Sequence, residues 1–421
     1  MASVLLSALA GMGAAEHAVT VAERLRTRGH RVSVVTSAAA LQPYRRLGLE
    51  VHEVVEPPMP QLLPGLPPVV QRARQLLTRV QQVVIDPLPE QWRVVRRVIE
   101  DAAVDVVVTD PLFLGGSMLA ALPREDRPAV VMLGFAAPWY PDPGVPPYGM
   151  GIPPADDEQA DRLRTRGFNL IAARAMVRLS RSFNEQVERT FGVRREGDLR
   201  TTPALADVFA QLSVPRFEYP LTALPENFRF VGPLAPQPGA TAPTWWSPDD
   251  ESPVVAVRAT SATAVQDLVL PTLQAFAGTA STVVVAGVGR RGVAAAWTAE
   301  LPADVHVEQR LPWARLQPRR TVVVSDGDHQ HVQHALRRGI PLVVAGTLET
   351  DVETAARVAW TGAGVDLRTR RPTPKALRAA VERVRADPLF RGAAARIAAQ
   401  IATTDAEGSI AEIVEELAAA R

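Results

Sequence analysis

The chain has 421 residues, which exceeds a typical single domain, so two domains are expected. Its 47% hydrophobic and 22% charged residues are typical of a folded protein, and a formal charge of +1 argues against a general attraction to nucleic acid or to an anionic membrane. The absence of cysteine excludes disulfides, thiolate metal sites and cysteine nucleophiles.

Short apolar runs alternate with helical patterns in the N-terminal half. Residues 3–9 form the first apolar run, and no basic residue precedes it, since the first is Arg24. We therefore interpret this run as a buried strand and not as a signal peptide. Residues 16–28 follow with apolar side chains at helical spacing. Further strand-like runs cover residues 31–36, 51–55, 104–109, 129–133, 206–212 and 228–231, and a long helical pattern covers about 156–190.

The C-terminal half repeats this alternation. A segment rich in proline and glycine, residues 232–240, predicts the linker between two domains. The end of the chain, residues 373–421, has a helical pattern with breaks near Pro388 and Thr403. Strand-like runs cover residues 254–257, 282–286, 305–307, 321–324 and 342–345, and helical patterns cover 262–276, 333–338 and 351–360.

The alternation predicts an α/β fold with two parallel-sheet domains, residues 1–235 and 236–404. Open sheets of this kind bind ligands beyond the carboxyl ends of their strands, so we expect the site in a cleft between the domains. No uncharged apolar run free of proline reaches the about 18 residues of a membrane span, so we expect a cytoplasmic protein that does not cross a membrane.

Two loops, residues 57–68 and 138–150, are rich in proline and in apolar or aromatic side chains. Such a composition is incompatible with a helix or a central strand. The loops either line a pocket for an apolar ligand or pack over the core, and the sequence leaves both readings open. The candidate ligand-binding residues are Leu62, Leu63, Trp139, Tyr140, Tyr148 and Met150.

Several phrases of the sequence are similar, in order and spacing, to those of one enzyme family. The chain resembles, over essentially its whole length, the antibiotic and macrolide glycosyltransferases of the UDP-glycosyltransferase-like family. The phrases are Gly29-His30 before the second strand, Val107-Val108-Thr109-Asp110, Phe230-Val231-Gly232-Pro233-Leu234, Leu311-Pro312-Trp313-Ala314, Gly339-Ile340-Pro341 and Gly362-Ala363-Gly364.

The resemblance implies the GT-B fold, in which two Rossmann-like α/β/α domains face an interdomain cleft. The N-terminal domain would hold an apolar acceptor, and the C-terminal domain a nucleotide sugar as co-substrate, with no other cofactor. In the implied inverting transfer, a base deprotonates an acceptor hydroxyl, which displaces the nucleoside diphosphate. No metal is normally needed, because helix N-termini and backbone N–H groups stabilise the diphosphate. A terminal helix, residues 405–421, would return toward the N-terminal domain.

The position of the family's catalytic base departs from the pattern. The family has a histidine in the loop after the first strand, where this chain has Ala14, which cannot accept a proton. The family's supporting aspartate is retained as Asp110, and His17 lies three residues after Ala14, on the same face if the helix has begun. His17 is therefore a candidate base with Asp110 as its partner, and Glu16 is a further candidate catalytic residue. Alternatively, His17 only starts a helix and Asp110 caps a strand.

The diphosphate-binding phrase of the family is also altered. Asp326 stands where the family has a histidine that touches the diphosphate, Gly327 matches a family glycine, and His331 replaces a hydroxyl residue. Asp326 and Asp328 add two carboxylates near a helix N-terminus, where they would repel a diphosphate unless a cation bridges them.

Other donor-site positions match in part. By the resemblance, Trp313 would stack on the nucleotide base, His334 replaces the glutamate that holds the ribose, and Asp351 would bind sugar hydroxyls. Ser261 would bond phosphate, and the nearby Arg258 would offset the added carboxylates. The plainer alternatives are core packing for Trp313 and a structural ion pair for Arg258.

A histidine cluster within residues 326–334 has the ligand types of a metal site. His331 and His334 are three residues apart, on one face of a helix, and His329 and Asp326 precede them. Imidazole with carboxylate suits zinc, manganese or iron. The alternative, which we adopt, is no metal and a polar helix start capped by an aspartate.

Three hypotheses follow. We expect a glycosyltransferase of natural-product biosynthesis with a nonstandard base. A second hypothesis keeps the fold but not the donor, with Asp110, Glu16 or His17 catalysing cyclisation, elimination or isomerisation. A third is a non-catalytic partner of another biosynthetic enzyme, which Ala14 suggests. The sequence leaves open the sugar, the nucleotide, the acceptor and whether the protein is a homodimer.

Overall fold

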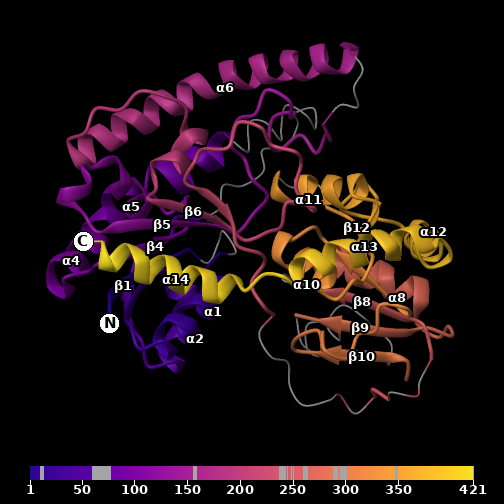
Figure 1. Cartoon of the computed structure of the whole chain (residues 1–421). Coiled ribbons are helices and arrows are strands. Elements are labelled where there is room, and N and C mark those ends of the chain that lie inside the picture. Colours follow the sequence, from indigo (N-terminus) through magenta and orange to yellow (C-terminus); the bar gives the residue numbers. More distant parts are fainter. Residues whose placement is uncertain are drawn as a thin grey trace.

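A computed structural model gives the fold of the chain. The structure describes residues 1–9, 14–58, 77–154, 159–236, 243, 245–247, 249, 251–258, 264–287, 293, 301–346 and 349–420. Two lobes lie side by side, each built around one sheet (Figure 1). None of the described helices combines the length and the hydropathy that a bilayer-spanning segment needs.

The first lobe contains a seven-stranded sheet in the order β3-β2-β1-β4-β5-β6-β7, and all its neighbouring strands are parallel. The central strands are rich in valine and buried along their length, as expected where helices cover both faces of a parallel sheet. The strands are β1 (Ser3–Ser7), β2 (Arg31–Thr36), β3 (Glu50–Glu53), β4 (Val106–Thr109), β5 (Ala129–Gly134), β6 (Val208–Gln211) and β7 (Phe228–Phe230).

Helices cover the faces of this sheet. The 33-residue α6 confirms the predicted long helix and runs along the outer edge of the lobe (Figure 1). The helix α4 was not predicted from the sequence, although Val95 and Val98 form its buried face. The helices are α1 (Ala14–Thr27), α2 (Leu41–Arg46), α4 (Leu88–Ala102), α5 (Leu114–Ser117) and α6 (Gln159–Phe191), with shorter 3₁₀ or π turns at Ala38–Ala40, Val80–Ile85, Met118–Ala121, Arg124–Asp126 and Leu199–Leu205.

The second lobe contains a six-stranded parallel sheet in the order β10-β9-β8-β11-β12-β13. Renumbered from its own first strand, this order is 3-2-1-4-5-6, which is the doubly wound order that the first lobe also contains. The strand β13 was not predicted, because its three residues are too short for a detectable pattern. The strands are β8 (Val254–Arg258), β9 (Thr282–Ala286), β10 (Val305–Glu308), β11 (Thr321–Ser325), β12 (Leu342–Val344) and β13 (Gly364–Asp366).

Aspartate and threonine caps set the ends of several helices in the second half. Asp328 begins α10 earlier than the apolar pattern predicted, because its side chain accepts from the His331 N–H. Thr373, Asp387 and Asp405 cap the last three helices, which break where the sequence predicted. The helices are α8 (Leu270–Phe276) with a π turn before it (Val265–Val269), α10 (His329–Arg337), α11 (Glu349–Trp360), α12 (Pro374–Ala386), α13 (Pro388–Ile401) and α14 (Ala406–Ala419).

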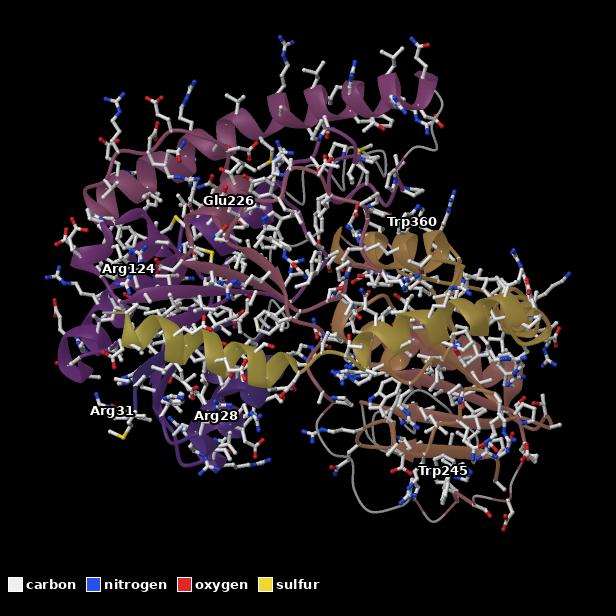
Figure 2. The ribbon with its side chains drawn as sticks, viewed as in Figure 1. Arg28, Arg31, Arg124, Glu226, Trp245 and Trp360 are labelled. Atoms are coloured by element: carbon white, nitrogen blue, oxygen red, sulfur yellow. The ribbon has the colours of Figure 1, made fainter. Side chains whose placement is uncertain are left out.

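The last helix, α14, leaves the second lobe and packs on the first (Figure 1). Its Ile410, Ala411 and Val414 are fully buried in the same core cluster as Leu25 of α1. Arg28, labelled in Figure 2, forms an ion pair with Glu415 of α14 at 2.8 Å. The predicted α/β class with two parallel-sheet domains is therefore confirmed, and we call the lobes the N-terminal and C-terminal domains.

Candidate active site

A cavity of about 190 Å³ lies between the two domains at the carboxyl ends of strands of the C-terminal sheet. Arg258 is the last residue of β8, and Gly287 and Gln309 directly follow β9 and β10. The opposite wall comes from α1 of the N-terminal domain. The residues that line the cavity are His17, Thr20, Ala235, Pro236, Arg258, Gly287, Gln309, Arg310, Leu311, Trp313, His331 and His334.

Three imidazoles from the two domains meet at this cavity. The ring of His17 on α1 lies 6.2 Å, centroid to centroid, from the rings of both His331 and His334 on α10, which are 5.9 Å apart. The sequence predicted that His331 and His334 share one face of a helix. It gave no sign that His17 would face them.

Charged groups hold His331 in place. The Asp328 carboxylate accepts from the His331 backbone N–H at 2.9 Å and lies 3.1 Å from its ring Nδ1. The same Nδ1 contacts the guanidinium of Arg258. The end of β8 and the first turn of α10 therefore present to the cavity a guanidinium and an imidazole, both suited to an anionic ligand.

The His334 side chain leaves one nitrogen without a partner. Burial, and then the nearby His17 and Arg258, hold the pKa of His334 well below its ordinary value, so its ring is neutral. The ring hydrogen-bonds the Leu234 backbone, and Nε2 has no partner among the described residues. A neutral ring whose other nitrogen donates to a carbonyl keeps a lone pair on Nε2, so His334 offers a hydrogen-bond acceptor.

The sequence left open whether Trp313 packs in the core or faces the donor, and in the structure its side chain contacts both the core and the cavity. Its side chain is 9% exposed and belongs to the core of the C-terminal domain, yet it also lines the cavity. Its ring lies 5.8 Å from that of His334, at an interplanar angle of 66°.

Three predicted donor-site residues come together beside the cavity but are not among its lining residues. A Cβ built on Gly327, whose φ is +102°, would lie 2.8 Å from the Asp351 Cβ, so only glycine fits there.

Burial and the Asp328 charge raise the pKa of Asp326 to about 6. Within the described residues, no three histidine, aspartate or glutamate side chains are arranged to hold a metal ion. Ser261 lies outside the described residues.

The candidate base positions lie at the start of α1. This helix begins at Ala14, so His17 is in its first turn, as the shared-face argument required. Ala14 is fully buried in the core of the N-terminal domain, whereas His17 is partly exposed and stacks near Phe135, with ring centroids 6.5 Å apart. The Glu16 side chain is outside the described part of the chain.

Asp110 directly follows β4, which pairs with β1. Its Oδ1 accepts from the Leu112 backbone N–H at 2.8 Å. Burial raises the pKa of Asp110 to about 6, against the opposing effect of that hydrogen bond.

The aromatic loop after β5 forms a separate, smaller cavity of about 20 Å³ lined by Trp139, Tyr140 and Tyr148. The rings of Trp139 and Tyr148 are edge-to-face at 6.4 Å. This volume suits about one water, so the loop is packed closed in this structure. Met150 is 41% exposed and lines neither cavity. Leu62 and Leu63 lie outside the described residues.

The sequence analysis missed a buried ionic network between the domains. Arg357 of α11 pairs with Glu218 of the N-terminal domain at 2.6 Å and with Glu353 of α11 at 2.8 Å. An arginine four residues after a glutamate on a helix is a common surface pattern, so only the position of Glu218 in space makes this group distinctive. No sequence motif singled out the cavity residues Thr20, Gln309 and Arg310 either.

Comparison with known proteins places the chain in a family. The family described as "Erythromycin biosynthesis protein CIII-like, C-terminal domain" matches residues 274–419. The 4'-demethylrebeccamycin synthase of Lentzea aerocolonigenes is 31% identical over 434 residues, which cover 99% of each chain. This chain belongs to the UDP-glycosyltransferase-like family. UDP-glycosyltransferase 2 of Phaeomoniella chlamydospora is also 31% identical to this glycosyltransferase, over 80% of this chain and 77% of that protein.

Solved structures confirm the predicted GT-B fold of the glycosyltransferase. The glycotransferase of kitacinnamycin superposes with a TM-score of 0.69 at 20% identity, over 99% of each chain. Glycosyltransferase VinC in complex with DTDP superposes with a TM-score of 0.68 at 18% identity, over the whole of both chains. With the sequence relatives, these findings identify a glycosyltransferase-like enzyme of natural-product biosynthesis. They do not favour a donor-free enzyme or a non-catalytic partner.

Proposed function

We propose that this glycosyltransferase transfers a sugar, with inversion, from a nucleotide sugar to a hydroxyl of an apolar natural product. The observation that carries the proposal is the cavity lined by both domains, in which His17 faces His331 and His334. An inverting transfer needs the acceptor hydroxyl, a base and the donor held together, and a cleft between two domains can bring them into this geometry.

His17 is the proposed base. Its imidazole takes the proton of the acceptor hydroxyl while that oxygen attacks the anomeric carbon. The bond from this carbon to the diphosphate oxygen breaks, and the nucleoside diphosphate leaves with the electron pair. Asp110 would stabilise the imidazolium through its charge. It directly follows β4, which pairs with β1, and so lies at the carboxyl ends of these strands, near the start of α1. Glu16 remains an alternative base.

The remaining cavity residues would hold the donor. Arg258 and Arg310 supply positive charge for the diphosphate, and Trp313 supplies an aromatic face for the nucleotide base. The unpartnered Nε2 of His334 would accept a hydrogen bond from a ribose hydroxyl. Asp351 would hold sugar hydroxyls at the start of α11, and Ser261 and His331 would contact phosphate.

The acceptor is proposed to lie on the N-terminal side, against Trp139, Tyr140 and Tyr148. Because this loop is closed, it would have to open for an apolar molecule to enter. Leu62, Leu63 and Met150 stay candidates for the same pocket. A solved neighbour of similar fold, a spinosyn rhamnosyltransferase, is described as complexed with an aglycone, which supports an acceptor of this kind.

Calorimetry with thymidine and uridine diphosphates and their sugars tests the proposal first, since VinC is described in complex with DTDP. We expect binding of a nucleoside diphosphate by the wild type and a loss of affinity of at least about tenfold in Arg258→Ala, because a charge-assisted contact contributes about 1.5–3 kcal/mol. Arg319→Ala, on the exposed surface, should bind like the wild type. If no nucleotide binds the wild type, the transferase proposal is wrong.

A further inference from the structure

Glu353 of the C-terminal domain accepts hydrogen bonds at the end of the aromatic loop, residues 138–150, of the N-terminal domain. The Oε1 of Glu353 accepts from the backbone N–H groups of both Gly149 and Gly151, each at 2.9 Å. Gly151 has a φ of +60°, and a Cβ on it would lie 3.0 Å from the Cβ of Val352. At Gly151 the chain is therefore fitted against α11, and this position has no room for a side chain.

The same glutamate is part of a buried chain of charges. Its Oε2 pairs with Arg357, which is 1% exposed and whose Nε donates to Glu218 at 2.6 Å. The ring of Tyr219 covers the Arg357 guanidinium at 4.0 Å, and Tyr219 also packs against Trp360, which ends α11 (Figure 2). Two carboxylates thus share one guanidinium.

This shortage of positive charge explains the contacts to the loop. A buried carboxylate is stable only when its lone pairs are satisfied, and Arg357 is divided between Glu353 and Glu218. Glu218 obtains a further donor from the Ser213 hydroxyl at 2.6 Å. The amides of Gly149 and Gly151 do the same for Glu353.

The network also reaches α10. The side chain of Gln333, which belongs to α10, donates to the Ser213 hydroxyl at 2.6 Å. The first turns of α10 line the cavity between the domains. The aromatic loop is therefore connected to both helices at which the donor would bind. The connection runs only through buried groups, which have few alternative arrangements.

From this geometry we infer that Glu353 is a positioning residue, through which the nucleotide-sugar domain holds the aromatic loop, residues 138–150, and the following Gly151 in the closed conformation that the loop regains over a bound acceptor. The inference rests on the proposed function for the identity of the acceptor. Glu353 also lines the small cavity beside the aromatic rings, but its carboxylate oxygens are engaged by Arg357 and by the amides of Gly149 and Gly151, and it acts through the backbone of these two glycines.

Hydrogen exchange of the free enzyme tests the two hydrogen bonds from Gly149 and Gly151 to Glu353 without any substrate. In Glu353→Ala, peptides that cover residues 145–152 should exchange at least tenfold faster, because both amides lose their acceptor. In Glu353→Gln the amide oxygen still accepts, so exchange should stay within about threefold of the wild type. Glu382→Ala, an exposed glutamate of α12, is the control for loss of a carboxylate. Unchanged exchange at 145–152 in Glu353→Ala would overturn the inference.

Kinetics separate positioning from a general loss of stability. We expect Glu353→Ala to raise KM for the acceptor at least tenfold, while kcat at saturating acceptor and the Kd of the nucleoside diphosphate change less than threefold. Glu353→Gln should restore most of the acceptor affinity. Equal losses of donor and acceptor affinity, or faster exchange throughout the molecule, would contradict a positioning role. Failure of the wild type to bind any nucleotide would refute the proposed function alone, since the exchange experiment still tests the contact.

Discussion

At the scale of single residues, Ala14 stands where the resemblance places the family's base, and His17 lies three residues further along the chain. The Ala14 side chain is fully buried in the core and does not line the cavity. His17, one turn further along α1, faces the cavity instead. As the proposed base, His17 would take the acceptor proton from the α1 side of the cavity.

His17→Ala is expected to lower kcat by about 10²–10⁴-fold, the usual contribution of a general base. Nucleotide affinity should fall by less than tenfold, because His17 belongs to the acceptor side of the cleft. Steady-state kinetics with calorimetry measures both quantities. His52→Ala, on β3, serves as the control. A His17→Ala enzyme with wild-type kcat would shift the role of base to Glu16 or to the substrate itself.

Asp110 gives a pH-dependent prediction of stability. Burial raises its pKa to about 6, so the folded protein binds the Asp110 proton more tightly than the unfolded chain does. Its contribution to stability is therefore fully present below the unfolded pKa near 4 and is lost as pH rises to about 6. Asp110→Asn should be more stable than the wild type at pH 8, by up to about 3 kcal/mol, and similar to it at pH 4. Urea unfolding at both pH values measures the difference, and a gain independent of pH would contradict the assignment.

At the scale of elements, close contact between α10 and α11 shapes the donor side. Gly327 before α10 touches Asp351 in the first turn of α11, and Gly346 lies between the same segments. The segments before the two helices that would hold diphosphate and sugar are therefore packed tightly against each other.

Gly327→Ala tests this contact against a matched position. Gly29 has a similar φ of +87° with nothing within 4 Å of an added Cβ, whereas at Gly327 the Cβ would also collide with Asp351. Gly29→Ala should destabilise by about 1 kcal/mol through backbone strain alone. Gly327→Ala should cost about 2–4 kcal/mol and weaken nucleotide binding, because overpacking adds to the strain. Equal melting temperatures for the two variants would show that the contact is loose.

Much of the element order could be predicted from the sequence, because valine-rich runs between amphipathic helices are the local signature of parallel sheets. The strand β13 was missed because three residues, one of them glycine, form no pattern. The site was predictable only within segments. His331 and His334 are neighbours on one helix, but their meeting with His17, and that of Arg357 with Glu218, depends on how two domains pack. No local rule encodes such contacts.

At the scale of the whole molecule, α14 joins the two domains through apolar burial more than through charge. Ile410 is fully buried in the N-terminal core, whereas the Arg28–Glu415 pair is at the surface. Ile410→Ala should destabilise the enzyme by about 2–5 kcal/mol. Arg28→Ala should leave the urea midpoint nearly unchanged, since solvent screens exposed ion pairs. Chemical denaturation of both variants checks the comparison, and a larger effect of Arg28→Ala would reverse this ranking.

The return of α14 has a consequence for how the protein is made. The N-terminal domain leaves the ribosome long before α14, which completes its core. The apolar face of α1 that α14 covers therefore stays exposed to solvent until the rest of the chain has been translated. A premature stop just before Ala406 would spare every proposed substrate contact and still yield a protein that aggregates.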